Sequence, residues 1–374
     1  MFLRPLEREF GWTRSELTSV YSIYLLVHGF TAPFVGFFFD RLGPRWVYGA
    51  GMASLAAAFL FAGSLSTLGQ FYLLVGALVG VGVSLNGMVP GSALLSRWYR
   101  KRLSTALGIA FSAMGVGTIV FVPLAQHLVD SQGWRSTYRA LGILVLVATP
   151  IVLALPWRRF AAGHPDFPHR KAGTGGEEGW TLRKAIRTPL YWGLVQLFFC
   201  TSISMFTVIV QLVAFFIDAG FSPLTAATAY GLVGMLSALS VMGSGWTSDR
   251  FGYRPAVTAS FIGTAIGMAL LVGLNFTPSM ILLGLFVPIF GLCMGTRGPV
   301  VSAISARAFA GSHVATIYGT IYSSNAVGAA IGAFLGGVLH DLTGGYGTGF
   351  GVALFFIALA SMPFWTIPAL RDYR

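Results

Sequence analysis

The feature of this sequence that most limits its fold is a series of long apolar runs. Each has about 20 residues or more, enough for a helix to cross the hydrocarbon core of a bilayer. We count eleven runs, which cover residues 15–38, 46–67, 70–96, 103–129, 137–156, 190–217, 224–247, 255–275, 279–305, 314–339 and 348–369. Their length, without short alternating segments, predicts an all-α membrane protein rather than a β-barrel.

Composition supports this prediction. Charged residues make up 10% of the 374 positions and apolar residues 55%, too few polar groups to cover a water-soluble surface. The net charge of +12 would suit a nucleic-acid-binding protein, but the basic residues lie in short connections between the apolar runs. We therefore expect the lipid bilayer as a partner and no nucleic acid.

The basic residues also predict the orientation of the chain. Of 24 Lys and Arg residues, 18 lie in alternate connections on one side, five lie on the other side and Arg297 lies within a run. The positive-inside rule assigns the richer side to the cytoplasm. We expect a multi-pass protein of the plasma or inner membrane, with this chain's N-terminus outside and its C-terminus cytoplasmic.

An internal repeat relates the two halves of the sequence. The segment GFFFDRLGPR at Gly36–Arg45 recurs as GWTSDRFGYR at Gly245–Arg254, so that Asp40 and Asp249 are 209 positions apart. Other landmarks in the same bundles keep an offset of 209 to 211. A repeated bundle of membrane helices is typical of secondary transporters, in which two halves rock about a site between them.

A polar segment rich in Pro, Gly and charge separates the two repeats. It predicts an N-terminal bundle at residues 1–156, a cytoplasmic linker at 157–189 and a C-terminal bundle at 190–374. Two apolar runs precede the Asp249 loop, whereas one precedes the Asp40 loop. We therefore expect one further span upstream of Met1, so that eleven helices of a twelve-helix, pseudo-symmetric fold are present.

Several motifs resemble the major facilitator superfamily, and within it the monocarboxylate and oxalate transporter-like branch. They are EREFGWTRSEL, GFFFDRLGPR, SRWYRKRLSTALGIAFSAMGVG and IYGTIYSSNAVGAAIGAFLGGVLHDLTGGY. The resemblance implies that residues 1–156 form helices 2–6 and residues 190–374 form helices 7–12 of a major facilitator-type fold. It also implies carboxylate substrates.

Arg297 is the principal candidate for substrate binding. It lies about 18 residues into its run, and a guanidinium at that depth is costly unless it is paired or hydrated. Its planar fork suits a carboxylate, and no Asp or Glu lies in the middle of any visible span. These observations favour a small organic anion, a monocarboxylate or a dicarboxylate. Alternatively, Arg297 snorkels toward the membrane surface or bonds backbone carbonyls freed by Gly298 and Pro299.

Other polar residues near the middle of spans are candidates for the same cavity. Asn86, Asn325 and His28 lie near span centres, and Tyr24 and Gln211 add hydrogen-bonding groups. The asparagines serve equally well as polar contacts between helices, and His28 as a packed histidine. If a proton is co-transported, His28 is the group that titrates near neutral pH.

The repeated loops predict a gate. In the resembled superfamily such loops hold the outward-facing state through ion pairs that break during transport. The expected gating residues are Asp40, Arg41, Arg45, Asp249, Arg250 and Arg254. Simple retention of helix ends in the cytoplasm is the alternative.

We therefore expect a secondary transporter that works by alternating access. Two other functions remain open, a facilitator-type efflux pump for hydrophobic compounds and a non-transporting membrane sensor with the same fold. No enzymatic activity and no cofactor are expected. Cys200 and Cys293 lie within apolar runs and suggest no metal site.

Overall fold

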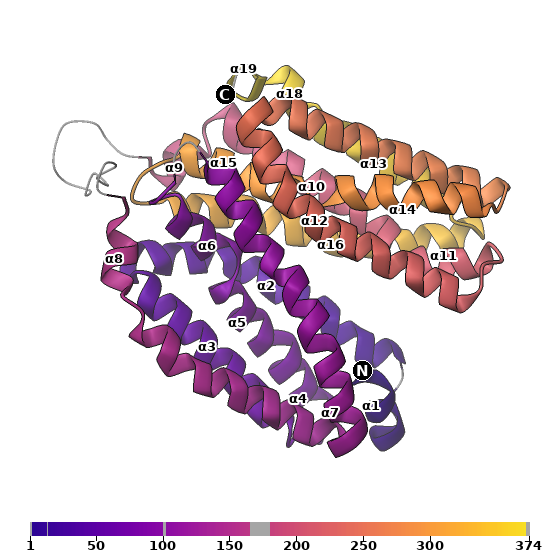
Figure 1. Ribbon diagram of the computed structural model, residues 1–374, viewed down its shortest axis with the longest axis horizontal. Coiled ribbons are helices and arrows are strands. Elements are labelled where there is room, and N and C mark those ends of the chain that lie inside the picture. The colour runs from indigo at the N-terminus through magenta and orange to yellow at the C-terminus, as the bar shows by residue number, and fades with distance from the viewer. Residues whose placement is uncertain (1, 13, 100–101, 165–179, 372–374) are drawn as a thin grey trace. The chain divides into compact units, whose positions relative to one another are not determined.

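The computed structural model describes residues 2–12, 14–99, 102–164 and 180–371 (Figure 1). Every regular element in these ranges is a helix. Residues 165–179 of the predicted linker lie outside the described residues. The all-α prediction is therefore confirmed for the described part of the chain.

The first half of the chain contains the elements up to α8. They are α1 Leu3–Phe10, α2 Arg14–Leu42, α3 Pro44–Ala62, α4 Leu68–Phe71, a π-helical segment η1 Tyr72–Leu78, α5 Val79–Asn86, α6 Met88–Leu95, α7 Leu103–Ala154 and α8 Trp157–Ala162.

The second half contains eleven helices among the described residues. They are α9 Leu182–Ala185, α10 Pro189–Ile209, α11 Leu212–Asp218, α12 Pro223–Phe251, α13 Tyr253–Phe276, α14 Met280–Met294, α15 Arg297–Ala308, α16 Val314–Thr343, α17 Gly347–Ser361, α18 Pro363–Thr366 and α19 Pro368–Arg371.

Ten helical stretches among the described residues are long and apolar enough to cross a membrane. The prediction of eleven differs because of α7, whose 52 residues would measure about 78 Å, far more than one crossing needs. The backbone of Gly133 is non-helical, with φ 79° and ψ 163°, so α7 consists of two helices. The predicted run 137–156 lies in the qualifying stretch Leu124–Ala154, and the run 103–129 begins with the shorter apolar helix Leu103–Ala113.

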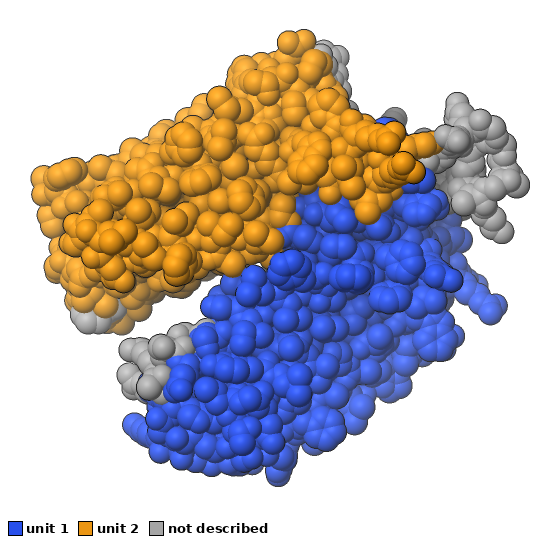
Figure 2. All heavy atoms as spheres, turned by 180° about the vertical axis from the view of Figure 1, so that it is seen from behind, with its two compact units in different colours: residues 1–98, 116–181, 309–323 blue, residues 99–115, 182–308, 324–374 orange. Residues whose placement is uncertain are grey.

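The chain divides into two compact units (Figure 2). Unit 1 comprises residues 1–98, 116–181 and 309–323, and unit 2 comprises 99–115, 182–308 and 324–374. Unit 1 thus includes the start of α16, and unit 2 includes the start of α7. The first residues of α7 and of α16 therefore each group with the unit that does not contain the rest of their helix, and we call them the exchanged helix starts. They are counterparts in the repeat, since Thr105 and Thr316 are 211 positions apart.

Close backbone packing holds each exchanged helix start. In unit 1, a side chain on Gly36 of α2 would overlap the backbone of Ala315 in α16, and in unit 2, one on Gly245 of α12 would overlap the backbone of Ser104 in α7. Small residues permit such approaches between membrane helices. Gly36 and Gly245 are counterparts in the repeat, so both repeats pack in the same way.

Candidate functional site

Two counterpart spans are interrupted at the same repeat position. In the first half, α5 ends at Asn86 and α6 begins at Met88, because Gly87 has an extended backbone with φ −89° and ψ −152°. In the second half, α14 ends at Met294 and α15 begins at Arg297. Met88 and Arg297 are 209 positions apart. Matching interruptions in two repeats indicate where a solute site is built.

Arg297 begins α15 and is buried, with 2% of its surface exposed. Its Nη2 donates hydrogen bonds to the carbonyl oxygen of Ser260 at 3.1 Å and to Oγ1 of Thr264, both in α13. The guanidinium carbon lies 4.6 Å from the centre of the Phe261 ring. Thr264, Ser260 and Phe261 were not predicted from the sequence.

The remaining donors of Arg297 are unsatisfied. Its Nε and Nη1 are buried and have no hydrogen-bond partner, and no carboxylate in the described part of the chain forms an ion pair with it. A buried cation without a counter-charge is energetically costly. The two donors point to a place where an anion would be stabilised.

An aromatic cluster in unit 1 surrounds His28. The ring of His28 stacks on Tyr24 with centres 5.9 Å apart, and Tyr24 stacks on Tyr21 at 5.7 Å. Across from α2, the Nε2 of His28 and the hydroxyl of Tyr322 in α16 are 3.4 Å apart. The structure thus brings the predicted residues His28 and Tyr24 together and adds Tyr322.

The remaining predicted binding residues lie elsewhere. Asn86 donates from Nδ2 to the carbonyl of Gly82 at 2.9 Å and packs against Gly51 of α3, a contact between helices. Asn325 is half-buried in α16. Gln211 precedes α11, and its amide lies close to Gly336 of α16. His28, Tyr24 and Asn86 belong to unit 1, and Arg297, Asn325 and Gln211 belong to unit 2.

The predicted gating carboxylates each bind the start of a helix. In unit 1, Oδ2 of Asp40 accepts from the backbone N–H of Thr316 at 2.9 Å and from its hydroxyl at 2.8 Å. In unit 2, Oδ2 of Asp249 accepts from the N–H and hydroxyl of Thr105, both at 2.8 Å. A carboxylate is stabilised at the positive N-terminal end of a helix. The 211-residue offset between the two threonines was the available sequence signal for these partners.

The predicted gating arginines contact aromatic rings or are exposed. Arg41 lies over Phe37 and Arg250 over Trp246. Arg254 lies over Trp365, and Arg45 is exposed. The ion pair at this position instead joins Arg307 to Asp249, with 3.5 Å between Nη2 and Oδ1.

Sequence comparison assigns the chain to a family. The profile of the Major Facilitator Superfamily matches residues 1–296 and 238–373. The chain belongs to the Major Facilitator Superfamily. The fold and the family expected from the resemblance of its sequence motifs are thereby confirmed, and the chain is a multi-pass membrane protein.

Relatives within the superfamily are similar over nearly the whole chain. The uncharacterized MFS-type transporter YcxA of Bacillus subtilis (strain 168) is 26% identical and covers 96% of this chain and 88% of its own length. Monocarboxylate transporter 13 of Rattus norvegicus is 28% identical, with 93% of this chain and 78% of the relative covered. This superfamily member is thus a transporter that resembles monocarboxylate transporters.

Solved structures of the superfamily share the fold. The proton:xylose symporter XylE bound to 6-bromo-6-deoxy-D-glucose has a TM-score of 0.77 and 13% identity, over 98% of this chain and 90% of that one. The Escherichia coli fucose:proton symporter FucP has a TM-score of 0.72 and 15% identity, over 96% and 92%. At these identities the likeness shows the major facilitator fold alone.

Proposed function

We propose that this transporter moves a small organic anion, a monocarboxylate or a dicarboxylate, across the membrane by alternating access. The observation that carries the proposal is the buried guanidinium of Arg297, whose Nε and Nη1 have no partner. A substrate carboxylate supplies the counter-charge that the described residues around Arg297 do not. We also propose that the C-terminus is cytoplasmic and that the membrane is the plasma or inner membrane.

The geometry of the guanidinium suits a carboxylate. Its Nη2 is held by Ser260 and Thr264, which fixes the plane of the group, while Nε and Nη1 have no partner and direct their N–H bonds in different directions. Either donor can form a charge-assisted hydrogen bond with a carboxylate oxygen. Because the pairing takes place away from water, an anion gains more from it than a neutral solute does.

The relatives support this substrate class. The names of two of them, monocarboxylate transporters 13 and 11, describe carriers of monocarboxylates. Their similarity to this chain extends through both repeats, since 93% of the chain is covered by the first. This support comes from sequence and is independent of the geometry at Arg297.

Asp40 and Asp249 are proposed to gate the transport cycle. Each holds the start of a long helix through two hydrogen bonds. Contacts made in one state and lost in the other bias an equilibrium between two conformations. Release of the starts of α16 and α7 then accompanies the change of access, and the neighbouring Arg41, Arg45, Arg250 and Arg254 keep these ends at the membrane surface.

His28 is proposed to accept a proton if transport is proton-coupled. It lies within a span, and its imidazole is already beside the hydroxyl of Tyr322. Imidazole is the side chain whose charge changes near neutral pH. Uptake that responds to a pH gradient in the wild type and no longer does so in His28→Gln would support this role; an unchanged response would reject it.

Uptake of radiolabelled lactate and oxalate into proteoliposomes tests the substrate proposal. Arg297→Gln should reduce uptake by at least about tenfold, because it removes one side of a charge pair closed off from water. Arg183→Gln, at an exposed arginine of α9, is the matched control and should transport normally. Undiminished uptake by Arg297→Gln would refute the role of Arg297, and no uptake of any carboxylate by the wild type would refute the substrate class.

A further inference from the structure

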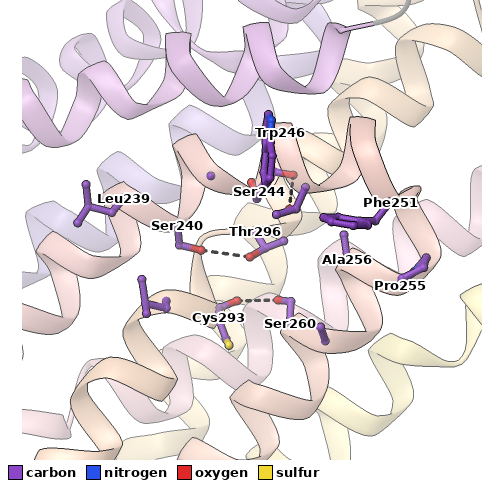
Figure 3. A pocket seen from close by; sticks show the side chains of 14 residues that line it. Leu239, Ser240, Ser244, Trp246, Phe251, Pro255, Ala256, Ser260, Cys293 and Thr296 are labelled. Carbon is purple, nitrogen blue, oxygen red and sulfur yellow. Dashed lines mark hydrogen bonds between the residues drawn. The ribbon is translucent and has the colours of Figure 1, made fainter.

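A crevice of about 630 Å³ runs along unit 2 between α12, α13 and α14 (Figure 3). Residues of α12 from Leu239 to Phe251 form one wall, and Pro255, Ala256, Ala259 and Ser260 of α13 with Leu292, Cys293 and Thr296 form the others. This volume lies within the range of about 300–1,000 Å³ that ligand sites occupy. Arg297 does not line it.

The hydroxyl groups in the crevice are already bonded within the protein. Ser240 and Thr296 share a hydrogen bond of 3.1 Å, and Ser260 donates to the carbonyl of Cys293 at 2.6 Å, as Figure 3 shows. Ser244 and Thr247 donate to backbone carbonyls of α12. The surface left to an occupant is therefore apolar, which suits a hydrocarbon chain.

The length and the open side of the crevice fit one acyl chain. Leu239 and Phe251 are twelve residues apart on one helix, about 18 Å at 1.5 Å per residue, and one leaflet contributes about 15 Å of hydrocarbon. Leu239, Trp246, Phe251 and Leu292 on its rim are each roughly half exposed. Apolar side chains exposed within a membrane span lie against lipid.

The side chain of Arg250 provides a positive charge at one end of the crevice. The guanidinium of Arg250 lies 5.2 Å from the Trp246 ring centre and 5.6 Å from the Phe251 ring centre, and no described carboxylate forms an ion pair with it. The adjacent Asp249 is bonded to Thr105 and Arg307. Tryptophan and arginine together mark the level of lipid headgroups, so a phosphate at this level would meet an uncompensated positive charge.

We propose that this crevice is a binding site for an anionic phospholipid, with one acyl chain lying between α12, α13 and α14 and the phosphate on Arg250. Basic residues at the ends of membrane helices bind anionic headgroups in this way. The crevice does not include Arg297, although Ser260 both lines it and accepts a hydrogen bond from Arg297. It gives the protein a specific lipid in addition to the surrounding bilayer.

Gly243 offers a direct test, because it lines the crevice and an added Cβ meets no atom within 4 Å. Gly243→Leu should fill the crevice without disturbing the helices. Gly231→Leu is the matched control, on the same helix, outside the crevice, and also with nothing within 4 Å. The measurement is native mass spectrometry of the full chain, titrated with phosphatidylglycerol or phosphatidylcholine in detergent.

The wild type and Gly231→Leu should retain phosphatidylglycerol, while Gly243→Leu should bind it about tenfold more weakly, because the acyl chain loses its buried surface. Arg250→Gln should lose about fivefold in affinity for phosphatidylglycerol and change less in affinity for phosphatidylcholine, because the choline cation offsets the charge of its phosphate. Equal binding of phosphatidylglycerol by the wild type and Gly243→Leu would overturn the site. Equal binding of the two lipids by the wild type would overturn the anionic headgroup.

Discussion

The carboxylates proposed to gate transport, Asp40 in unit 1 and Asp249 in unit 2, occupy the same position in the repeat but differ in their surroundings. Both accept two hydrogen bonds through Oδ2 from a threonine at the start of a helix, Thr316 for Asp40 and Thr105 for Asp249. Each threonine is the third residue of its helix. The repeat thus preserves the backbone arrangement at both sites.

Asp40 and Asp249 differ in the contacts of their other carboxylate oxygen, Oδ1. Oδ1 of Asp249 lies 3.5 Å from the guanidinium of Arg307, whereas Oδ1 of Asp40 is buried without a hydrogen-bond partner. Arg97, the counterpart of Arg307 in the repeat, donates to the carbonyl of Ala161 at 3.0 Å. The two repeats thus share the hydrogen bonds to the helix start, but a direct ion pair to the carboxylate is present only at Asp249 of these two sites.

A second pair of counterpart carboxylates, Glu9 and Asp218, also differs in its contacts between the two units. In unit 1, Glu9 accepts from Arg135 and from the indole N–H of Trp134, both at 2.6 Å. In unit 2, the counterpart of Glu9 is Asp218, which accepts from the hydroxyl of Tyr346 at 2.5 Å. An ion pair in one unit is thus replaced by a neutral donor in the other.

Replacement of Asp40 and of Asp249 should give the largest difference in stability between the two units. Asp249→Asn removes the ion pair with Arg307 and should lower the free energy of unfolding by about 3 kcal/mol. Asp40→Asn weakens the hydrogen bonds to Thr316 and removes a longer-range attraction to Arg97 but breaks no direct ion pair, and should lower it by about 1.5 kcal/mol. Denaturant unfolding in detergent micelles measures both variants. Equal losses would mean that the Arg307 ion pair contributes nothing.

The two packing glycines should behave alike. Gly36→Ala and Gly245→Ala each place a methyl group against the backbone of a neighbouring helix, so each should lower the free energy of unfolding by about 2 kcal/mol. Gly231→Ala, where an added Cβ meets nothing within 4 Å, is the control and should cause no loss. A large loss for only one of the pair would contradict the equivalence of the two packing sites.

Unit 1 should carry the acid-sensitive contact. Hydrogen bonds from Trp134 and then from Arg135 lower the pKa of Glu9 below its ordinary value of 4.5. Its contribution to stability is therefore complete above about pH 4.5 and is lost as the pH falls through the lower, folded-state pKa. The difference in unfolding midpoint between the wild type and Glu9→Gln should shrink on acidification below pH 4.5. A difference that grows in acid would reverse the assigned sign.

Unit 2 should carry the corresponding alkali-sensitive contact, with the smallest effect. Burial first, and then the hydrogen bond to Asp218 and its charge, raise the pKa of Tyr346 from 10.0 to about 12. The stability from this contact is complete below about pH 10 and is lost as the pH rises through about 12. An ultraviolet titration of tyrosinate, wild type minus Tyr346→Phe, should show one group that ionises well above pH 10. Ionisation of that group at its ordinary pKa would show that the contact with Asp218 does not form.

Much of the fold was predictable from the sequence, because the length of the apolar runs sets the spans and the 209-residue offset between the Asp40 and Asp249 loops reveals the repeat. The hydrogen-bond partners of Arg297 were not predictable from the sequence. Which face of α13 turns Ser260 and Thr264 toward α15 depends on helix rotation, and neither hydrophobicity nor spacing records that rotation. Asn86 shows the same limit, since its central position in a span left open whether it lines a cavity or contacts a neighbouring helix, and only the structure shows that its side chain lies close to Gly51 of α3.

Carboxylate-dependent thermal stabilisation of the purified protein tests the central claim, that Arg297 binds an anionic substrate. A panel of mono- and dicarboxylates, with amines of similar size as controls, should raise the melting temperature of the wild type for at least one carboxylate and for none of the amines. That shift should disappear in Arg297→Gln and persist in Arg183→Gln. The same shift in Arg297→Gln as in the wild type would contradict the claim.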